Sequence, residues 1–133
     1  MPPETRRRKS NKTMKEEIGT FEQLHIALRE LSSLLLQAGA CEEGVFKSKL
    51  IVSELVSNVL QHAAGGSANV SCAVRGERAF LTVRSIPAFF PPQESVCADV
   101  YSESGRGLFL VKSYSETYSV SKEGEIFIEV KIK

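Results

Sequence analysis

Residues 50–62 of the chain read LIVSELVSNVLQH, and apolar residues fall on nearly every side of the helix that this segment would form. A helix that is apolar all round is buried inside a protein. The pattern predicts a helix from about Val45 to Ala64, ended by the turn residues 65–67. We therefore expect this helix to lie between a sheet and another helix.

The residues on either side of this helix predict a sheet and two further helices. Upstream, apolar residues recur at spacings of three and four between Thr20, the expected N-cap, and Gly39, the expected stop. Downstream, the apolar period changes to two, which is typical of strands joined in hairpins. The expected elements are a short strand at 13–19, helices at 20–39, 45–64 and 107–115, and strands at 68–75, 78–85, 117–122 and 126–132. Hairpins with helices on one face predict an α+β fold, a two-layer sandwich with a mixed, mostly antiparallel sheet.

Composition places the chain among single-domain globular proteins. It has 133 residues, of which 42% are hydrophobic and 25% charged, and a chain of this length can bury its own core. No apolar run approaches the ~20 residues that span a bilayer, and no apolar signal core follows the charged start, so we expect no membrane contact. The three cysteines form no CxxC pair. Reduced thiols in a cytoplasmic protein therefore fit better than a zinc site or a disulfide scaffold.

Residues 1–12 are predicted to form a disordered basic tail ahead of a folded domain at 13–133. The basic run at 6–9 lies between two prolines and a polar stretch, which is typical of a solvated tail, and a nucleic-acid-binding arm is the alternative interpretation. The net charge of +1 gives the whole chain no general attraction to nucleic acid. We therefore expect no direct contact with nucleic acid.

Three polar residues on the central helix form the first candidate site. Glu54, Asn58 and His62 are spaced by four, which puts them on one stripe of the helix surface. An asparagine oxygen can ligate Mg²⁺, and a carboxylate one turn away can act as a base. From the spacing alone, a polar stripe that faces solvent at the end of a core helix is an equally good interpretation.

The second candidate site is the segment SGRGLFLVK at 104–112. Glycines where a loop enters a helix let backbone N–H groups approach a phosphate closely, and the helix dipole favours the negative charge. A flexible helix entry is the alternative interpretation of this G-x-G pair. The long proline-containing segment at 86–104 before it is expected to be a functional or mobile loop, such as a lid over a nucleotide.

Together these two segments resemble a known family. Residues 53–63 look like the N box of GHKL ATPases in its anti-sigma-factor kinase form, ExxxNxxxHA, and residues 105–112 resemble that family's second glycine box. The distance between the boxes and the hairpin between them also agree, and two boxes in order are more specific than either alone. The resemblance covers residues 13–133 and implies the Bergerat ATP-binding sandwich, with nucleotide held between the buried helix and the lid.

The resemblance also implies roles for individual residues and partners. Asn58 would coordinate the Mg²⁺ that bridges the phosphates of ATP, and Glu54 would be the base that activates a serine hydroxyl of a protein substrate. The nucleotide would be bound around Gly105, Arg106, Gly107 and Leu108. Members of the family sequester a sigma factor and phosphorylate a serine on an anti-sigma antagonist. They often form homodimers, and no surface patch can be assigned to that contact from the sequence.

The sequence departs from the family in its first glycine box, DxGxGF. By alignment, Ser85 stands at the Asp position, Pro87 at the first Gly and Phe89 at the second. A serine hydroxyl is a neutral and shorter partner for the adenine amino group than a carboxylate, so ATP binding should be about tenfold weaker or more. The family's last small motif, Gly-Thr, is Gly124-Glu125 here.

Three hypotheses follow from these matches and departures. Intact Glu54, Asn58 and the glycine segment favour an Mg-ATP-dependent serine kinase that is also an anti-sigma factor. The altered first glycine box favours a pseudokinase that binds a partner protein without turnover. A histidine-kinase-like ATPase fragment is ranked last, because no dimerisation and phosphoacceptor helix pair is seen.

Overall fold

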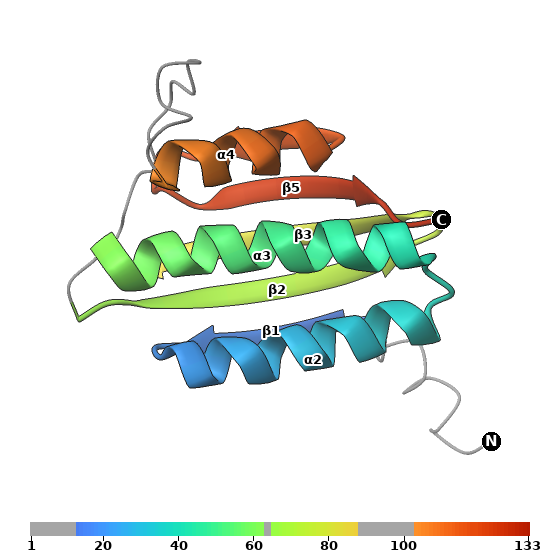
Figure 1. Ribbon diagram of the computed structural model, residues 1–133, viewed down its shortest axis with the longest axis horizontal. Coiled ribbons are helices and arrows are strands. Elements are labelled where there is room, and N and C mark those ends of the chain that lie inside the picture. Colours follow the sequence, from blue (N-terminus) through green and yellow to red (C-terminus); the bar gives the residue numbers. More distant parts are fainter. Residues whose placement is uncertain (1–12, 63–64, 88–102) are drawn as a thin grey trace.

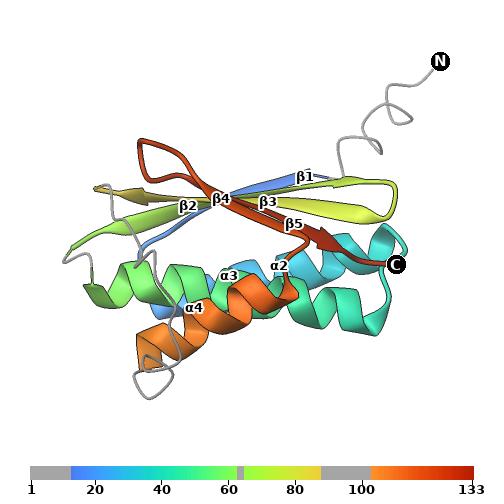
Figure 2. The ribbon, with the colours of Figure 1, turned by 90° about the horizontal axis from the view of Figure 1, so that it is seen from above.

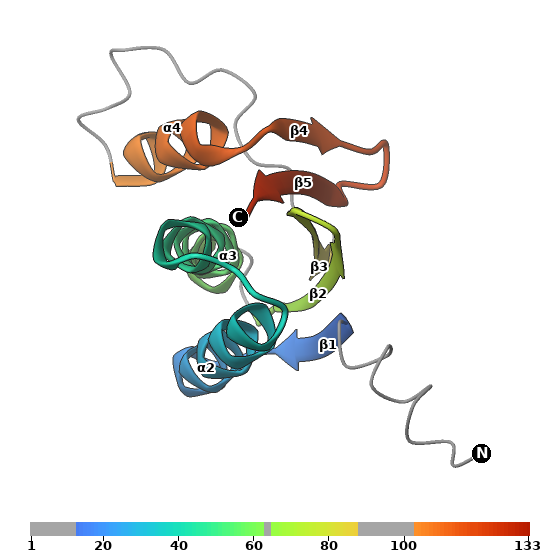
Figure 3. The ribbon, with the colours of Figure 1, turned by 90° about the vertical axis from the view of Figure 1, so that its right-hand side faces the viewer.

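The computed structural model describes residues 13–62, 65–87 and 103–133, and for residues 103–106 the backbone only (Figure 1). The predicted basic tail at 1–12 and residues 88–102 of the predicted loop lie outside these ranges. The fold is α+β, as the sequence predicts. Figures 2 and 3 show its two layers, a sheet on one side and three helices on the other.

The sheet has five strands in the order β1-β2-β3-β5-β4. All four pairings among the described strands are antiparallel, so the expectation of a mixed sheet is wrong. Hairpins join β2 to β3 and β4 to β5, whereas α2 and α3 separate β1 from β2 in the chain. The last strand, β5, lies inside the sheet between β3 and β4. The strands are β1 Thr13–Ile18, β2 Ser67–Arg75, β3 Arg78–Ile86, β4 Thr117–Val120 and β5 Ile126–Lys131.

The three helices are α2 Phe21–Gln37, α3 Glu42–His62 and α4 Glu103–Tyr114. The hydroxyl of Thr20 accepts a hydrogen bond from the N–H of Gln23 at 3.1 Å, which confirms Thr20 as the N-cap of α2. Helix α2 ends at Gln37, and Gly39 follows with a φ of 90°, a left-handed conformation that a glycine adopts without strain.

Two helices begin earlier than the sequence predicts. Helix α3 begins at Glu42 rather than Val45, because the Sγ of Cys41 accepts the N–H of Gly44 at 3.4 Å and two acidic residues favour the first turn. Helix α4 begins at Glu103 rather than Gly107, so Gly105 and Gly107 lie inside the helix. Glycine weakens a helix by only about 1 kcal/mol, and packing of the helix against α3 outweighs that.

Helix α3 is the centre of the molecule and runs across the sheet between α2 and α4 (Figure 1). It contacts both other helices and the strands β2, β3 and β5. The residues that face the sheet are buried in one apolar core with alternate residues of the strands. The outer side of α3 differs from the prediction of a helix buried all round, since Phe46 is 57% exposed and Leu50 is half-buried.

Candidate functional site

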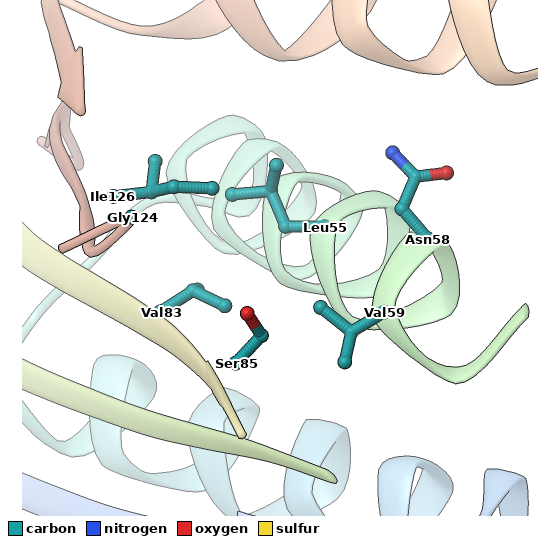
Figure 4. Close-up of a pocket in the computed structure, with 7 residues that line it drawn as sticks. All are labelled: Leu55, Asn58, Val59, Val83, Ser85, Gly124 and Ile126. Atoms are coloured by element: carbon teal, nitrogen blue, oxygen red, sulfur yellow. The ribbon is translucent and has the colours of Figure 1, made fainter. Parts of the chain in front are cut away.

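A small pocket lies between α3 and the end of β3, where the turn before β5 also reaches it (Figure 4). Most of its walls are apolar, and its polar side chains come from Asn58 on α3 and Ser85 on β3. Ligand pockets commonly combine apolar walls with a few placed polar groups in this way. The lining residues are Leu55, Asn58, Val59, Val83, Ser85, Gly124 and Ile126.

The three residues of the polar stripe, Glu54, Asn58 and His62, differ in how far they are buried. The side chain of Asn58 is buried, with 7% of the residue exposed, Glu54 is half-buried, and His62 is exposed at the last position of α3. The stripe therefore runs from the interior to the surface, and its Asn58 portion does not face solvent. A buried amide needs hydrogen-bonding partners, which makes Asn58 a functional candidate on burial as well as on spacing.

Ser85 points into the pocket because of its place in β3. Alternate residues of a strand face opposite sides of the sheet, and Ser85 shares the inner side with Val83 and Leu81. It lies opposite Ala68 of β2, and 7% of it is exposed. Ser85, which the sequence resemblance aligns with the family's Asp, therefore lines the pocket with a short hydroxyl.

The two polar groups are directed to different regions of the site. In Figure 4 the hydroxyl of Ser85 points into the space between Val83 and Val59, whereas Asn58 turns its amide group away from Ser85. Glu54, one turn earlier on α3, lies on the side of this helix that meets α4, as its contact with Gly107 shows. The site thus has an apolar part around Ser85 and a polar part around Asn58 and Glu54.

Glu54 and Gly107 bring the two sequence boxes into direct contact. A Cβ atom on Gly107 would overlap Oε1 of Glu54 and would lie 3.1 Å from its Cδ. Only a glycine at this position leaves the carboxylate where it is. The second turn of α4 and the carboxylate therefore meet at one point, which the G-x-G pattern alone did not predict.

The other residues of the second glycine box occupy the first turns of α4. The first four N–H groups of a helix lack intrahelical acceptors, so the N–H of Gly105 is available to an anion, whereas Gly107 lies one turn further in. Leu108 is buried with 1% exposed and anchors this end of α4. The side chain of Arg106 lies outside the described residues, so its role toward a phosphate stays a prediction.

The sequence did not predict the apolar walls of the pocket, nor that the turn between β4 and β5 lines it. Gly124, noted in the sequence only as a departure from Gly-Thr, lines the pocket and has a φ of 87°. Its neighbour Glu125 donates its N–H to the hydroxyl of Ser121 at 3.1 Å, which holds the turn. The apolar period of the strands carried the signal for Val83 and Ile126, but periodicity identifies a core face and does not tell a pocket from a core.

Comparison with known families decides the affiliation. The family model described as histidine kinase-like ATPase domain matches residues 19–128, most of the 133-residue chain. The chain belongs to this family. The matched range contains the pocket and both boxes, so Asn58, Ser85 and Gly107 all lie within the ATPase domain. A comparison with curated proteins gives no match.

Other site types find little support in the described part of the chain. No group of three or more His, Cys, Asp or Glu side chains is arranged to hold a metal ion among the described residues. Within the same residues, none of the helices combines the length and apolar character needed to cross a membrane.

The family's nucleotide fits the residues present, and the fit differs between the two parts of the site. The amide oxygen of Asn58 and the free N–H groups at the start of α4 suit a metal-bound phosphate chain. The apolar walls suit a base, with Ser85 as its one described hydroxyl partner. The volume beside Ser85 is about 10 Å³, room for about one water molecule, so a base would lie over this pocket rather than in it.

Proposed function

We propose that the domain binds Mg-ATP across α3 and the start of α4 and transfers the γ-phosphate to a serine of a protein substrate. The observation that carries the proposal is the meeting of Glu54 with Gly107 beside the buried Asn58. A carboxylate, an amide oxygen and the free N–H groups at the start of a helix are groups that phosphoryl transfer to a hydroxyl uses.

In this proposal each residue acts through an ordinary property of its side chain or backbone. Asn58 would hold Mg²⁺ through its amide oxygen, and the bound ion would neutralise charge on the phosphates. The N–H of Gly105 would donate to a phosphate oxygen. The carboxylate of Glu54 would accept the proton of the serine hydroxyl. At the same time the serine oxygen would bond to the γ-phosphorus, and the bond between the γ-phosphorus and ADP would break.

The resemblance of both boxes to anti-sigma-factor kinases supports a regulatory role for this chemistry. The serine would belong to an anti-sigma antagonist, and the domain would sequester a sigma factor in the cytoplasm until the antagonist competes for it. A homodimer would be the form in which the domain acts. Membrane contact and direct nucleic-acid contact have no part in this proposal.

The alternative function is a pseudokinase, a protein-binding module on the same scaffold. The observation that favours it is the pocket around Ser85, which offers a neutral hydroxyl in place of a carboxylate and a volume of about 10 Å³. A hydrogen bond to a charged group contributes about 1.5–3 kcal/mol and a neutral one about 1, so the base would be held less firmly. Binding of a partner protein does not require the hydrogen bond between Ser85 and the base.

Calorimetric titration of the protein with ATP and Mg²⁺ distinguishes the kinase from the pseudokinase. The kinase proposal expects micromolar binding that is lost in Asn58→Ala, because this change removes the metal-binding oxygen. Glu54→Gln should retain binding, since the amide keeps the shape of the side chain, but should lose phosphoryl transfer. Absence of binding at millimolar ATP would overturn the kinase proposal and leave the pseudokinase.

A further inference from the structure

A second concave surface lies on the opposite side of α3 from the nucleotide pocket. We call it the outer groove, and it is lined by residues of α2 and α3. Leu28 and Leu36, two turns apart, line it from α2, and Phe46, Lys49 and Leu50 line it from α3. Its volume is about 580 Å³, and it is open to solvent.

The outer groove exposes large apolar side chains that the fold itself leaves uncovered. Leu36 and Phe46 are each 57% exposed, the highest values among the large hydrophobic residues described. Phe46 is held in place by an edge-to-face contact with Tyr114 of α4, with ring centroids 6.3 Å apart. Single exposed apolar residues are common, but several that line one open groove mark an interaction surface.

Two charged side chains line the groove, the exposed Glu42 at the start of α3 and the half-buried Lys49 two turns later. Lys49 is half-buried, and among the described residues its ammonium group makes no ion pair. Its neighbour on the helix, Lys47, is in contrast paired with Glu43 at 3.2 Å. A lysine that covers apolar surface with its stem and leaves its charge without a partner favours an acidic group on whatever occupies the groove.

The dimensions of the outer groove match a helix. Along α3 it extends from Glu42 to Ser53, which corresponds to about 16 Å or three helical turns. Two helices already form its sides, and a third can place residues at spacings of three and four against them. We propose that the outer groove docks an amphipathic helix of a partner protein, which carries a carboxylate among its apolar anchors to pair with Lys49.

A second copy of the chain fits the groove less well. In a two-fold contact each copy presents the same surface, so a concave groove would meet a concave groove. Two concave surfaces leave the space between them unfilled. The proposed helix supplies the convex apolar ridge that fills this concave surface and a carboxylate that pairs with Lys49.

The test uses a pair of designed helical peptides and the full chain. Each peptide has about 14 residues, leucines at i, i+4, i+7 and i+11, a side-chain staple and a fluorescent label, because unconstrained helices of this length are marginal in water. One carries a glutamate beside the leucines and the other a lysine at the same position. By fluorescence anisotropy we expect about tenfold tighter binding of the glutamate peptide, and Lys49→Glu should invert this preference.

A matched pair of variants on α2 localises the binding. Leu36→Asp should weaken binding of the glutamate peptide about tenfold, because it places a charge at the apolar wall. Ile26→Asp is the control, since Ile26 is 48% exposed on the same helix but does not line the groove. Thermal unfolding should show both variants folded. Equal affinity for the two peptides in wild type, or equal loss of binding in both α2 variants, would overturn the proposal.

Sedimentation of the free protein tests the competing occupant. If no second copy occupies the groove, a substitution in it does not change self-association. The proposal therefore expects the same sedimentation coefficient for wild type and Leu36→Asp. Self-association that disappears in Leu36→Asp would overturn the proposal in favour of a dimer formed through the groove. The ATP titration is independent of these results, because Leu36 and Lys49 lie outside the nucleotide pocket.

Discussion

At the scale of single residues, the change that we propose for the family's nucleotide site centres on Ser85. Its hydroxyl points into the pocket, where it is 7% exposed, and no other polar side chain but that of Asn58 lines the described pocket. The identity of one side chain therefore determines whether a base meets a neutral or a charged acceptor. This makes affinity for ATP sensitive to a single substitution.

The first prediction is that Ser85→Asp raises the affinity for Mg-ATP about tenfold, because a charged acceptor adds about 1–2 kcal/mol over a neutral one. Calorimetry on both proteins measures the change. The same carboxylate would be buried among the apolar walls of the pocket, which costs free energy, so the free variant should unfold at a lower temperature than wild type. Ser85→Ala is the control and should bind more weakly than wild type. Unchanged affinity in Ser85→Asp would mean that Ser85 does not contact the base.

The proposed role of Gly107 depends on its lack of a side chain. Its second-turn position in α4 brings the backbone against the carboxylate of Glu54, and a Cβ atom would overlap Oε1. The overlapping atom is the end of a flexible side chain, so the carboxylate can rotate away. The consequence of adding a methyl group is therefore a misplaced base rather than a broken fold.

The second prediction is that Gly107→Ala lowers phosphoryl transfer at least about tenfold while the unfolding midpoint changes little. Alanine also favours the helix by about 1 kcal/mol, which offsets the cost of moving Glu54. ATP turnover and thermal unfolding are measured on the same preparation. Gly19→Ala is the matched control, because a Cβ there meets only Gln23 Oε1 at 3.6 Å and Ser67 Cβ at 3.8 Å. Equal turnover in the two variants would remove the positioning role of Gly107.

At the scale of elements, α3 is fixed to the end of the sheet by a backbone contact. The N–H of Cys41 donates to the carbonyl oxygen of Ile132 at 2.7 Å, just before α3 begins. A Cβ on Gly44 would lie 2.5 Å from Cα and 2.6 Å from the carbonyl oxygen of Ile132. The first turn of α3 therefore packs directly on the backbone that follows β5.

The third prediction is that Gly44→Ala destabilises the fold by about 1–3 kcal/mol, although alanine is the better helix former. The atoms it would overlap are backbone, which cannot move without displacing the end of β5. Urea unfolding followed by circular dichroism measures the change. Gly107→Ala is the comparison, since the same substitution there meets a mobile side chain. A stability of Gly44→Ala equal to wild type would show that α3 shifts on the sheet without cost.

The sequence predicts the elements well where local patterns determine them. The period of two in the strands and the N-cap at Thr20 are local signals, and the fold class follows from their order. The starts of α3 and α4 could not be predicted in the same way, because a sulfur cap at Cys41 and packing of α4 on α3 determine them. Tertiary contacts override the weak preference of glycine for helix ends.

The candidate site, too, could be predicted only where local sequence patterns determine it. Glu54 and Asn58 were found because helical spacing places them on one stripe, and Ser85 because it occupies a position in a recognisable box. The apolar walls and the contact of Gly107 with Glu54 depend on which surfaces meet across the fold. The outer groove could not be predicted from the sequence either, because the apolar residues of α3 predicted a buried helix, whereas Phe46 is exposed.

At the scale of the whole molecule, α3 separates two surfaces of different character. Its inner side carries the pocket around Ser85 against the sheet, and its outer side carries the outer groove. Both depend on one core, in which α3 contacts β2, β3 and β5. A probe at the centre of this core therefore reports whether variants at either surface still fold.

Cys72 is such a probe. It lies in β2 between Met14 of β1 and Leu81 of β3, it is 1% exposed, and burial raises the pKa of its thiol to about 12. Because the thiolate is the reactive form, a buried thiol with a raised pKa is inert in the native protein at about pH 8. Cys41, by contrast, is exposed at the turn before α3.

The fourth prediction is that Cys72 reacts with a thiol reagent only when the chain unfolds. In a Cys41→Ser, Cys97→Ser background, labelling at about pH 8 should be slow in buffer and should accelerate with urea in parallel with the loss of circular dichroism. Gly44→Ala should speed this labelling in buffer by about tenfold or more, because each 1.4 kcal/mol of lost stability raises the open population tenfold. Gly107→Ala and Leu36→Asp should leave it close to the wild-type rate. Fast labelling of Cys72 in native wild type would mean that β2 opens locally, and the two surfaces of α3 would then not share one cooperative core.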